Sequence, residues 1–160
     1  IDLAEETKEQ IRLLARGLRP STLDTVGLNL TLESFCRDYA RRTQIPIDYR
    51  GIESDELSDA AAMCVYRTLQ EALNNIAKHA DAARARVSLH RTVETVTLVV
   101  EDDGVGFTVG GHPRTEDRSP GIGLIGIAER LELFGGKLDL AKSKLGGARL
   151  SATLPLEGSS

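Results

Sequence analysis

A long helical pattern followed directly by two strand patterns constrains the fold of this chain more than any other feature. Residues 57–80 repeat apolar side chains at helical spacing, whereas residues 84–91 and 95–101 have the pattern of strands, the second rich in Val and Leu. A further helical pattern and two further strand patterns follow at residues 122–134, 137–142 and 148–155. Because helices and sheets bury their apolar sides against one another, we predict an α/β (α+β) two-layer sandwich, with a mixed sheet packed against helices.

Two further helical patterns stand before this region. In residues 1–18 apolar side chains recur at helical spacing, and no capping residue precedes the first of them. We expect this segment to be the end of a helix that begins upstream. A second helix is predicted from the capping-box spacing of residues 21–24 to about Thr43. Pro46 then favours a short edge strand at residues 46–50, since proline cannot donate a hydrogen bond to a central ladder.

The composition excludes several classes of protein. The chain has 160 residues, 41% of them hydrophobic, and a formal net charge of −4. These values are typical of one globular domain and do not favour binding to nucleic acid or to an anionic membrane surface. Cys36 and Cys64 have no metal-binding spacing, so we expect buried thiols and a reducing compartment. Since the longest apolar run, residues 60–66, is too short to cross a bilayer and no signal peptide is present, we predict a cytoplasmic domain.

Polar side chains gather on one face of the helix predicted for residues 57–80. At 100° per residue, Glu71, Asn75 and Lys78 fall within about 60° of one another, opposite the apolar stripe. The carboxylate and the amide oxygen suit Mg²⁺, and the ammonium suits a phosphate. A solvated helix face is the simpler alternative. His79 borders the same stripe and would contact a phosphate, cap the helix or pack against it.

An acidic cluster and two glycines end the strand predicted for residues 95–101. Asp102 would accept a hydrogen bond from the exocyclic amine of a base, and Gly104 and Gly106 would let the backbone approach that ligand closely. A hairpin turn built on the Asp-Gly pair is the alternative, although a polar segment rather than a second strand follows. This segment alone leaves both interpretations open.

A second group of glycines leads into the last predicted helix. Gly121, Gly123 and Gly126 would place free N–H groups and the positive end of the helix dipole near a phosphate, the alternative being an ordinary loop-to-helix junction. The spacing also matches the dinucleotide-binding fingerprint, with Asp139 close to its acidic position. That fingerprint must follow a strand, whereas here a polar segment ending in Pro120 precedes it, so we reject the dinucleotide interpretation.

Taken in order, these segments resemble the ATP-binding domain shared by sensor histidine kinases, DNA gyrase, mismatch-repair ATPases and heat-shock chaperones. The matching segments are the N box (70–80, QEALNNIAKHA), the first glycine box (102–106, DDGVG), the second glycine box (121–126, GIGLIG) and a weaker closing box (146–150, GGARL). In the closing box Ala148 stands where a Thr is frequent. Residues 18–28 further resemble the linker of nitrate-sensor-type histidine kinases. The resemblance covers essentially the whole chain and implies a Bergerat-type ATP-binding fold.

The resemblance also implies a role for each site residue. Asn75 would be the direct Mg²⁺ ligand, and Glu71, the candidate catalytic residue, would act through a water that is bound to magnesium or takes part in catalysis. Lys78 and His79 would face the phosphates, Asp102 would bind the adenine amine, and the glycines would form the pocket floor and the hinge of a lid over residues 107–120. The implied ATP-binding set is Asn74, Asn75, Lys78, His79, Asp102, Gly104, Gly106, Gly121, Gly123, Leu124 and Gly126.

The function implied is that of the catalytic domain of a sensor histidine kinase. The chain would comprise the end of an upstream dimerisation and phosphoacceptor helix with its linker (1–19), the catalytic domain (20–157) and a tail (158–160). The γ-phosphate of Mg-ATP would pass to a histidine on the upstream domain and then to a response regulator, in a homodimeric full-length protein. Because the opening helix carries no histidine, we expect the isolated chain to bind ATP without phosphorylating itself.

Two alternatives remain open at this point. A Ser/Thr kinase that phosphorylates an anti-sigma antagonist has the same fold. A nucleotide-binding module without turnover would use ATP only to reorder its lid. Transfer to serine would favour the first, and tight ATP binding without transfer to any helical hairpin would favour the second.

Overall fold

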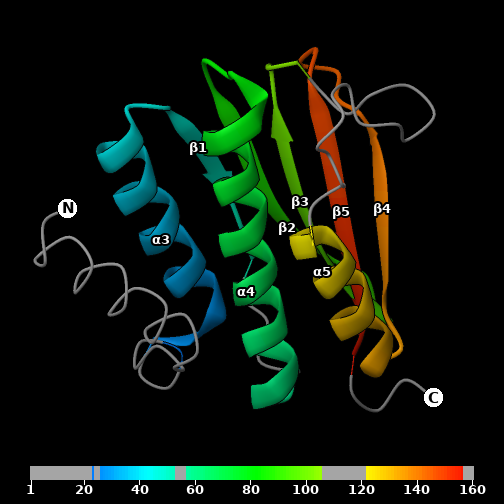
Figure 1. Cartoon of the computed structure of the whole chain (residues 1–160). Helices are drawn as coiled ribbons and strands as arrows, with labels where there is room; N and C mark the ends of the chain where they lie inside the picture. Colours follow the sequence, from blue (N-terminus) through cyan, green and yellow to red (C-terminus); the bar gives the residue numbers. More distant parts are fainter. Residues whose placement is uncertain (1–22, 24–25, 53–56, 106–121, 157–160) are drawn as a thin grey trace, which may run out of the picture.

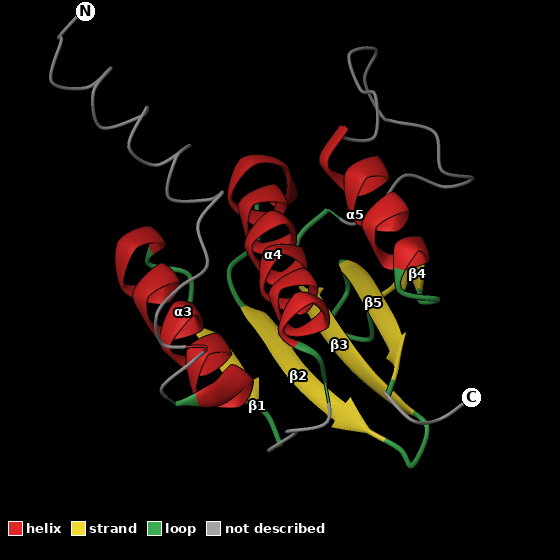
Figure 2. Ribbon diagram, turned by 90° about the horizontal axis from the view of Figure 1, so that it is seen from below, coloured by secondary structure: helices red, strands yellow, loops and turns green. Residues whose placement is uncertain are grey.

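The computed structural model describes residues 23, 26–52, 57–105 and 122–156. Its strands are Ile47–Arg50 (β1), Ala85–Arg91 (β2), Thr95–Asp102 (β3), Lys137–Lys142 (β4) and Ala148–Pro155 (β5). Its helices are Gly27–Thr43 (α3), Asp59–Asn75 (α4) and Ile122–Leu133 (α5), and a π-helix, η1, continues α4 over Ile76–Ala80. The strands form one mixed sheet, and the helices lie together on one of its faces (Figure 1, Figure 2). The predicted two-layer α/β sandwich is therefore confirmed.

β1 is the edge strand that Pro46 predicts. It pairs in parallel with β2, with Ile47 beside Ala85, whereas the other neighbouring strands pair antiparallel. The strand order is β1-β2-β3-β5-β4, so β5 lies between β3 and β4 although it comes last in the sequence. This order brings the end of β3 next to the beginning of β5, where Glu101 pairs with Arg149.

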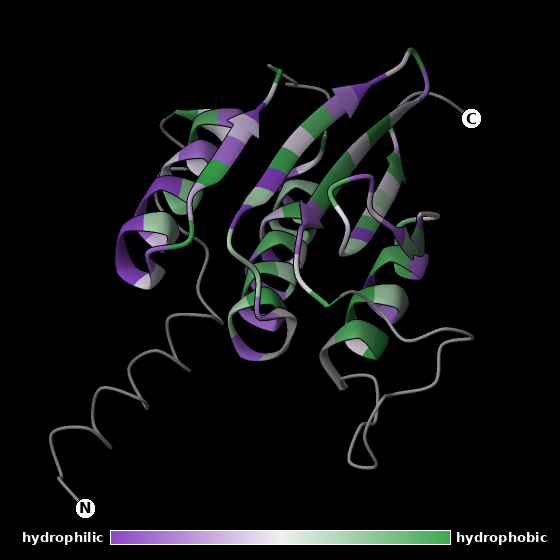
Figure 3. Ribbon diagram, turned by 90° about the horizontal axis from the view of Figure 1, so that it is seen from above, coloured by the Kyte–Doolittle hydropathy of each residue, from purple (hydrophilic) through white to green (hydrophobic). Residues whose placement is uncertain are grey.

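The core lies between the sheet and the helices. Alternate side chains of the central strands are buried against the helices, for example Val87, Leu98 and Leu154. Figure 3 shows this alternation as hydrophobic and hydrophilic bands along the strands. Leu69 and Leu73 of α4 are fully buried in the same core. The apolar stripe of α4 therefore faces the sheet, and its polar stripe faces away from it.

The helix predicted for residues 57–80 differs from the structure at its end. Ser58 caps its start, the hydroxyl oxygen accepting a backbone N–H at 3.1 Å. The α-helical winding stops where η1 begins, and the π-helical turn ends before Asp81, whose φ of 51° is left-handed. The predicted helix therefore extends to residue 80, with α-helical winding over Asp59–Asn75 and π-helical winding over Ile76–Ala80.

The two cysteines are buried as predicted. Cys36 and Cys64 are each 2% exposed, and burial raises the pKa of the Cys36 thiol to about 12. In the ranges that the structure describes, no helix is both long and apolar enough to cross a membrane. The helix predicted for residues 1–18, most of the capping box at 21–24 and the lid predicted at 107–120 lie outside the described residues.

Candidate functional site

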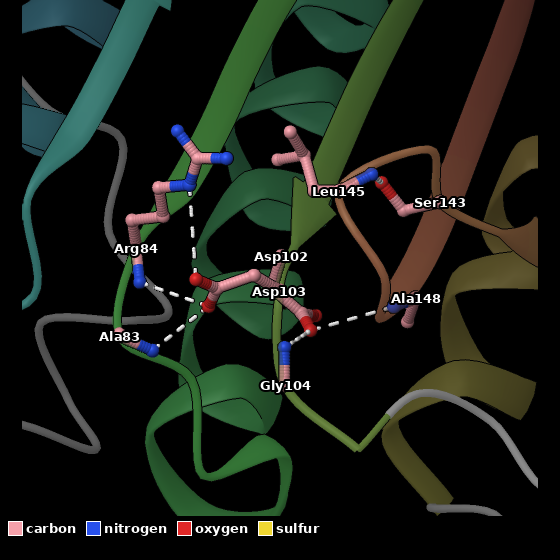
Figure 4. A network of polar contacts seen from close by, with 8 residues as sticks. All are labelled: Ala83, Arg84, Asp102, Asp103, Gly104, Ser143, Leu145 and Ala148. Carbon is pink, nitrogen blue, oxygen red and sulfur yellow. Dashed lines mark hydrogen bonds and ion pairs between the residues drawn. The ribbon is translucent and has the colours of Figure 1, made fainter.

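A buried carboxylate marks the end of β3. Asp102 is only 3% exposed, and its Oδ1 accepts hydrogen bonds from the backbone N–H groups of Gly104 at 2.8 Å and Ala148 at 3.4 Å (Figure 4). Burial raises the pKa of Asp102, and these two hydrogen bonds oppose the rise. Among the described residues no donor forms a hydrogen bond with Oδ2.

The strand pairing tests the hairpin interpretation of this segment. β3 is paired on one edge with β2 and on the other with β5. Both edges are therefore occupied, and the segment that follows Asp102 cannot fold back on β3 as a hairpin. The hairpin alternative is wrong, and the binding interpretation of Asp102 remains.

Asp103 has a different role from its neighbour. Its Oδ1 accepts the backbone N–H groups of Ala83 at 2.8 Å and Arg84 at 3.0 Å, and its Oδ2 lies 3.7 Å from the Arg84 guanidinium (Figure 4). The Arg84 backbone hydrogen bond is the main reason that the pKa of Asp103 lies below its usual range. Asp103 thus ties the end of β3 to the beginning of β2.

The closing glycine box completes the surroundings of Asp102. The N–H of Gly147 donates to the backbone oxygen of Asp102 at 3.1 Å. A Cβ at Gly147 would overlap the Asp102 carboxylate and lie 2.6 Å from the Gly104 nitrogen. Ala148 contributes its backbone N–H, so the replacement of a frequent Thr leaves that contact intact. Our sequence reasoning did not count Gly147 and Ala148 as site residues, although the weak closing-box resemblance pointed to them.

The predicted polar stripe of α4 lies on the side of the helix away from the sheet. Glu71, Asn74 and Asn75 are half-buried and Lys78 is exposed, whereas Ile76 is buried in the core. The end of α4 and the end of β3 lie at the same end of the sandwich (Figure 1). A short connection after η1 leads to β2, whose first residue pairs with Asp102.

A cleft between α4 and α5 brings part of this stripe together with residues that the sequence analysis missed. Its lining residues are Arg67, Gln70, Glu71, Asn74 and Arg130. Neither arginine forms a salt bridge with a carboxylate in the described part of the chain. Arg67 precedes Glu71 by one helical turn, which could have indicated it. Arg130 carried no such signal, because only the packing of α5 beside α4 brings it there. Asn75 and Lys78 do not line this cleft.

The other predicted site residues are described to different extents. Gly104 and Leu124 are half-buried, and a Cβ at Gly126 would meet nothing within 4 Å among the described residues. His79 and Gly123 are described only as part of the helical backbone of η1 and α5. Gly106 and Gly121 lie outside the described residues.

The oxygen donors on α4 fit a nucleotide-bound magnesium ion. Mg²⁺ commonly takes one or two oxygens from a protein and the rest from phosphates and water. Asn75 and Glu71 offer an amide oxygen and a carboxylate on the outer side of α4. Among the described residues no group of three or more His, Cys, Asp or Glu is placed to hold a metal ion.

Comparison with known proteins gives a consistent family. Residues 61–158 match the model of the histidine kinase-, DNA gyrase B- and HSP90-like ATPases. Sensor histidine kinase MctS of Rhizobium johnstonii is 38% identical over 149 residues, which are 92% of this chain and 32% of that protein. The histidine-protein kinase/phosphatase UhpB of Salmonella typhimurium is 36% identical over 150 residues, which are 92% of this chain and 28% of that protein. This chain thus spans about a third of the length of these relatives.

A solved structure agrees with these matches. The ATP-binding domain of PrrB from Mycobacterium tuberculosis superposes with a TM-score of 0.60 at 27% identity, covering 79% of this chain and 92% of that domain. The family match, the relatives and the fold are all consistent with one family. This chain belongs to the histidine kinase-, DNA gyrase B- and HSP90-like ATPase family and is similar to the catalytic domains of sensor histidine kinases.

Proposed function

We propose that this chain holds Mg-ATP between Asp102 and the polar side of α4, as the catalytic domain of a sensor histidine kinase. The observation that carries the proposal is the buried Asp102 carboxylate, whose Oδ1 is held by two backbone N–H groups while Oδ2 accepts none from the described residues. An ionised carboxylate only accepts hydrogen bonds. It therefore suits the exocyclic amine of adenine, which only donates.

The phosphates would lie along the end of α4. Asn75 would ligate the magnesium ion, Glu71 would hold a water beside it, and Lys78 and His79 would face the phosphates. When bound, magnesium neutralises part of the phosphate charge. The guanidinium groups of Arg67 and Arg130 lie in the cleft that Glu71 lines, without a salt bridge to a described carboxylate. Their charge supports an anionic group at this position.

The reaction we propose is transfer of the γ-phosphoryl group to a histidine. The bond from phosphorus to the β–γ bridging oxygen breaks as the imidazole nitrogen bonds to phosphorus, which leaves ADP and a phosphohistidine. The acceptor would lie on an upstream helical domain, with residues 1–19 as the end of that domain and its linker, residues 20–157 as the catalytic domain and residues 158–160 as a tail. A response regulator would receive the phosphoryl group, and the whole protein would act as a homodimer with this domain in the cytoplasm.

Calorimetric titration with a non-hydrolysable ATP analogue and Mg²⁺ tests the adenine contact. In Asp102→Asn the amide NH₂ group can face the adenine amine. Two donors then face each other, and no hydrogen bond can form between them. We expect affinity to fall about tenfold or more, because a hydrogen bond to a charged group contributes about 1.5–3 kcal/mol.

Asp103→Asn is the matched control. Its amide oxygen can still accept the N–H groups of Ala83 and Arg84, so we expect affinity close to that of the unmodified chain. Equal affinity of Asp102→Asn and the unmodified chain would remove Asp102 from the site.

A further inference from the structure

The last turn of α4 changes its winding at a point that a side chain of α3 contacts. Tyr39 is 4% exposed, and its hydroxyl donates a hydrogen bond to the backbone oxygen of Leu73 at 2.6 Å. In an uninterrupted α-helix, this oxygen would accept the N–H of Ala77, four residues later. The Tyr39 hydroxyl therefore binds the oxygen that would accept the next α-helical hydrogen bond and so continue α4 by another turn.

The neighbouring hydrogen bonds agree with this insertion. The N–H of Ile76 is shared between the backbone oxygens of Ala72 and Leu73. The backbone N–H of Ala77 lowers the pKa of the Tyr39 phenol, which is consistent with a position near the phenol oxygen. The Tyr39 hydroxyl thus binds the Leu73 oxygen, which is the acceptor of one α-helical hydrogen bond. A side chain that enters the ladder in this way is a known cause of local irregularity in a helix.

The π-helical turn carries the two basic residues predicted to face the phosphates. η1 spans Ile76–Ala80 and includes Lys78 and His79. A π-helix closes its hydrogen bonds over five residues instead of four, so each turn is wider. The backbone positions of residues 78 and 79 are therefore rotated about the helix axis, relative to Asn75, from where continued α-helical winding would place them.

Tyr39 also lies close to the other half of the candidate site. Burial raises the pKa of its phenol, the charge of Arg42 and the Ala77 N–H oppose the rise, and the charge of Asp102 adds to it. Asp102 is thus near enough to act on the phenol electrostatically. The Tyr39 hydroxyl itself binds the last turn of α4, which leads into the turn predicted to bind phosphates.

We propose that Tyr39 is a positioning residue, whose hydroxyl holds the π-helical turn at the end of α4 and so places the backbone of residues 78 and 79 for contact with the phosphates of a bound nucleotide. This inference rests on the proposed function. A buried phenol needs a hydrogen-bond partner in any protein. Here the partner is the Leu73 carbonyl, which in an α-helix would accept the N–H of Ala77. The turn that contains Ala77 is η1, which also contains residues of the candidate site.

Tyr39→Phe tests the inference, because it keeps the ring in the core and removes only the hydroxyl. Without the hydroxyl, the N–H of Ala77 can bond to the Leu73 oxygen, and the turn can return to α-helical winding. We expect affinity for a non-hydrolysable Mg-ATP analogue to fall about fivefold or more, as expected for the loss of about one hydrogen bond. Affinity for adenosine, which has no phosphates, should stay within about twofold of the unmodified chain.

Tyr49→Phe is the matched control. The Tyr49 hydroxyl donates to Oδ1 of Asn29 at 2.7 Å, near the start of α3 and ten residues before Tyr39, or about 15 Å along the helix axis. This variant loses a comparable hydrogen bond elsewhere on α3. We expect it to leave the affinities for the ATP analogue and for adenosine unchanged.

Amide NMR without nucleotide provides a second, independent measurement. In Tyr39→Phe, the amide signals of residues 76–80 should shift, and exchange at Ala77 should slow as its α-helical bond forms. Unchanged signals there, or an equal loss of affinity for both ligands, would overturn the inference. Failure of the unmodified chain to bind either ligand would instead overturn the proposed function, and the NMR comparison would still decide the role of Tyr39 in the winding.

Discussion

Asp102 and Asp103 are adjacent carboxylates that the sequence does not distinguish. Asp102 is the last residue of β3 and is buried, whereas Asp103 follows the strand and binds the residues that precede β2. Burial raises the pKa of Asp102, whereas hydrogen bonds from the start of β2 lower that of Asp103. A single position along the chain therefore separates a buried group that we propose to bind a ligand from a group that connects two strands.

Gly147→Ala should disturb both stability and binding. A Cβ there would overlap the Asp102 carboxylate and lie within 2.7 Å of the Asp102 backbone oxygen, and backbone atoms cannot move aside like the end of a side chain. We expect the free energy of unfolding to fall by about 1–3 kcal/mol, as for other overpacked sites. Affinity for the ATP analogue should fall as well, because the Asp102 carboxylate must shift.

Gly126→Ala provides the contrast in the same urea unfolding experiment. A Cβ at Gly126 would meet nothing within 4 Å among the described residues. Alanine is favoured over glycine inside a helix by about 0.8–1.0 kcal/mol, so stability should rise slightly. If Gly147→Ala were as stable as the unmodified chain, the close packing around Asp102 would be unimportant.

At the scale of helices and strands, the spacing of apolar residues predicted those features that depend on neighbours in the sequence. The strands lie within one residue of their predicted bounds, because alternation of apolar side chains follows from burial of one face of a sheet. The π-helical winding of η1 was not predictable, since its cause is a tyrosine 34 residues before Leu73 in the sequence. Arg130 was missed for the same reason. Only the packing of α5 beside α4 brings it to Glu71.

The cleft between α4 and α5 leads to a prediction about its arginines. Arg130→Gln removes a positive charge beside Glu71, where the proposed function favours an anionic group, and we expect this group to be the outer phosphate. We expect affinity for the ATP analogue to fall about tenfold and affinity for ADP to change little, because a charge-assisted hydrogen bond contributes about 1.5–3 kcal/mol. Calorimetric titration with both nucleotides measures the difference.

Arg37→Gln on α3 is the control for loss of one positive charge. Arg37 lies 3.7 Å from Glu33 in an exposed ion pair, which contributes little. Both nucleotides should bind this variant like the unmodified chain. An equal fall in affinity for ATP and ADP in Arg130→Gln would place the arginine away from the outer phosphate.

For the whole molecule, the sandwich determines which groups can reach one another. The helices cover one face of the sheet, and the candidate site lies at the end of the sandwich where β3 and η1 end (Figure 1). His90 of β2 is five residues beyond Ala85, which pairs with Asp102, so it lies roughly 16 Å along the sheet from that level. His79 belongs to η1, the turn that we propose to lie next to the phosphates. Neither position suits an imidazole that must approach the γ-phosphate in line with its leaving oxygen.

We therefore predict that this 160-residue chain binds ATP but does not phosphorylate itself. The test is incubation with γ-labelled ATP, followed by acid and base treatment, because phosphohistidine is labile in acid and stable in base. Addition of an upstream helical hairpin that carries an acceptor histidine should produce the label on that hairpin. Asn75→Asp should reduce the transfer, because it disturbs the magnesium ligand. Acid-labile label on the 160-residue chain alone would show that one of its own histidines, at position 79, 90 or 112, reaches the γ-phosphate after all.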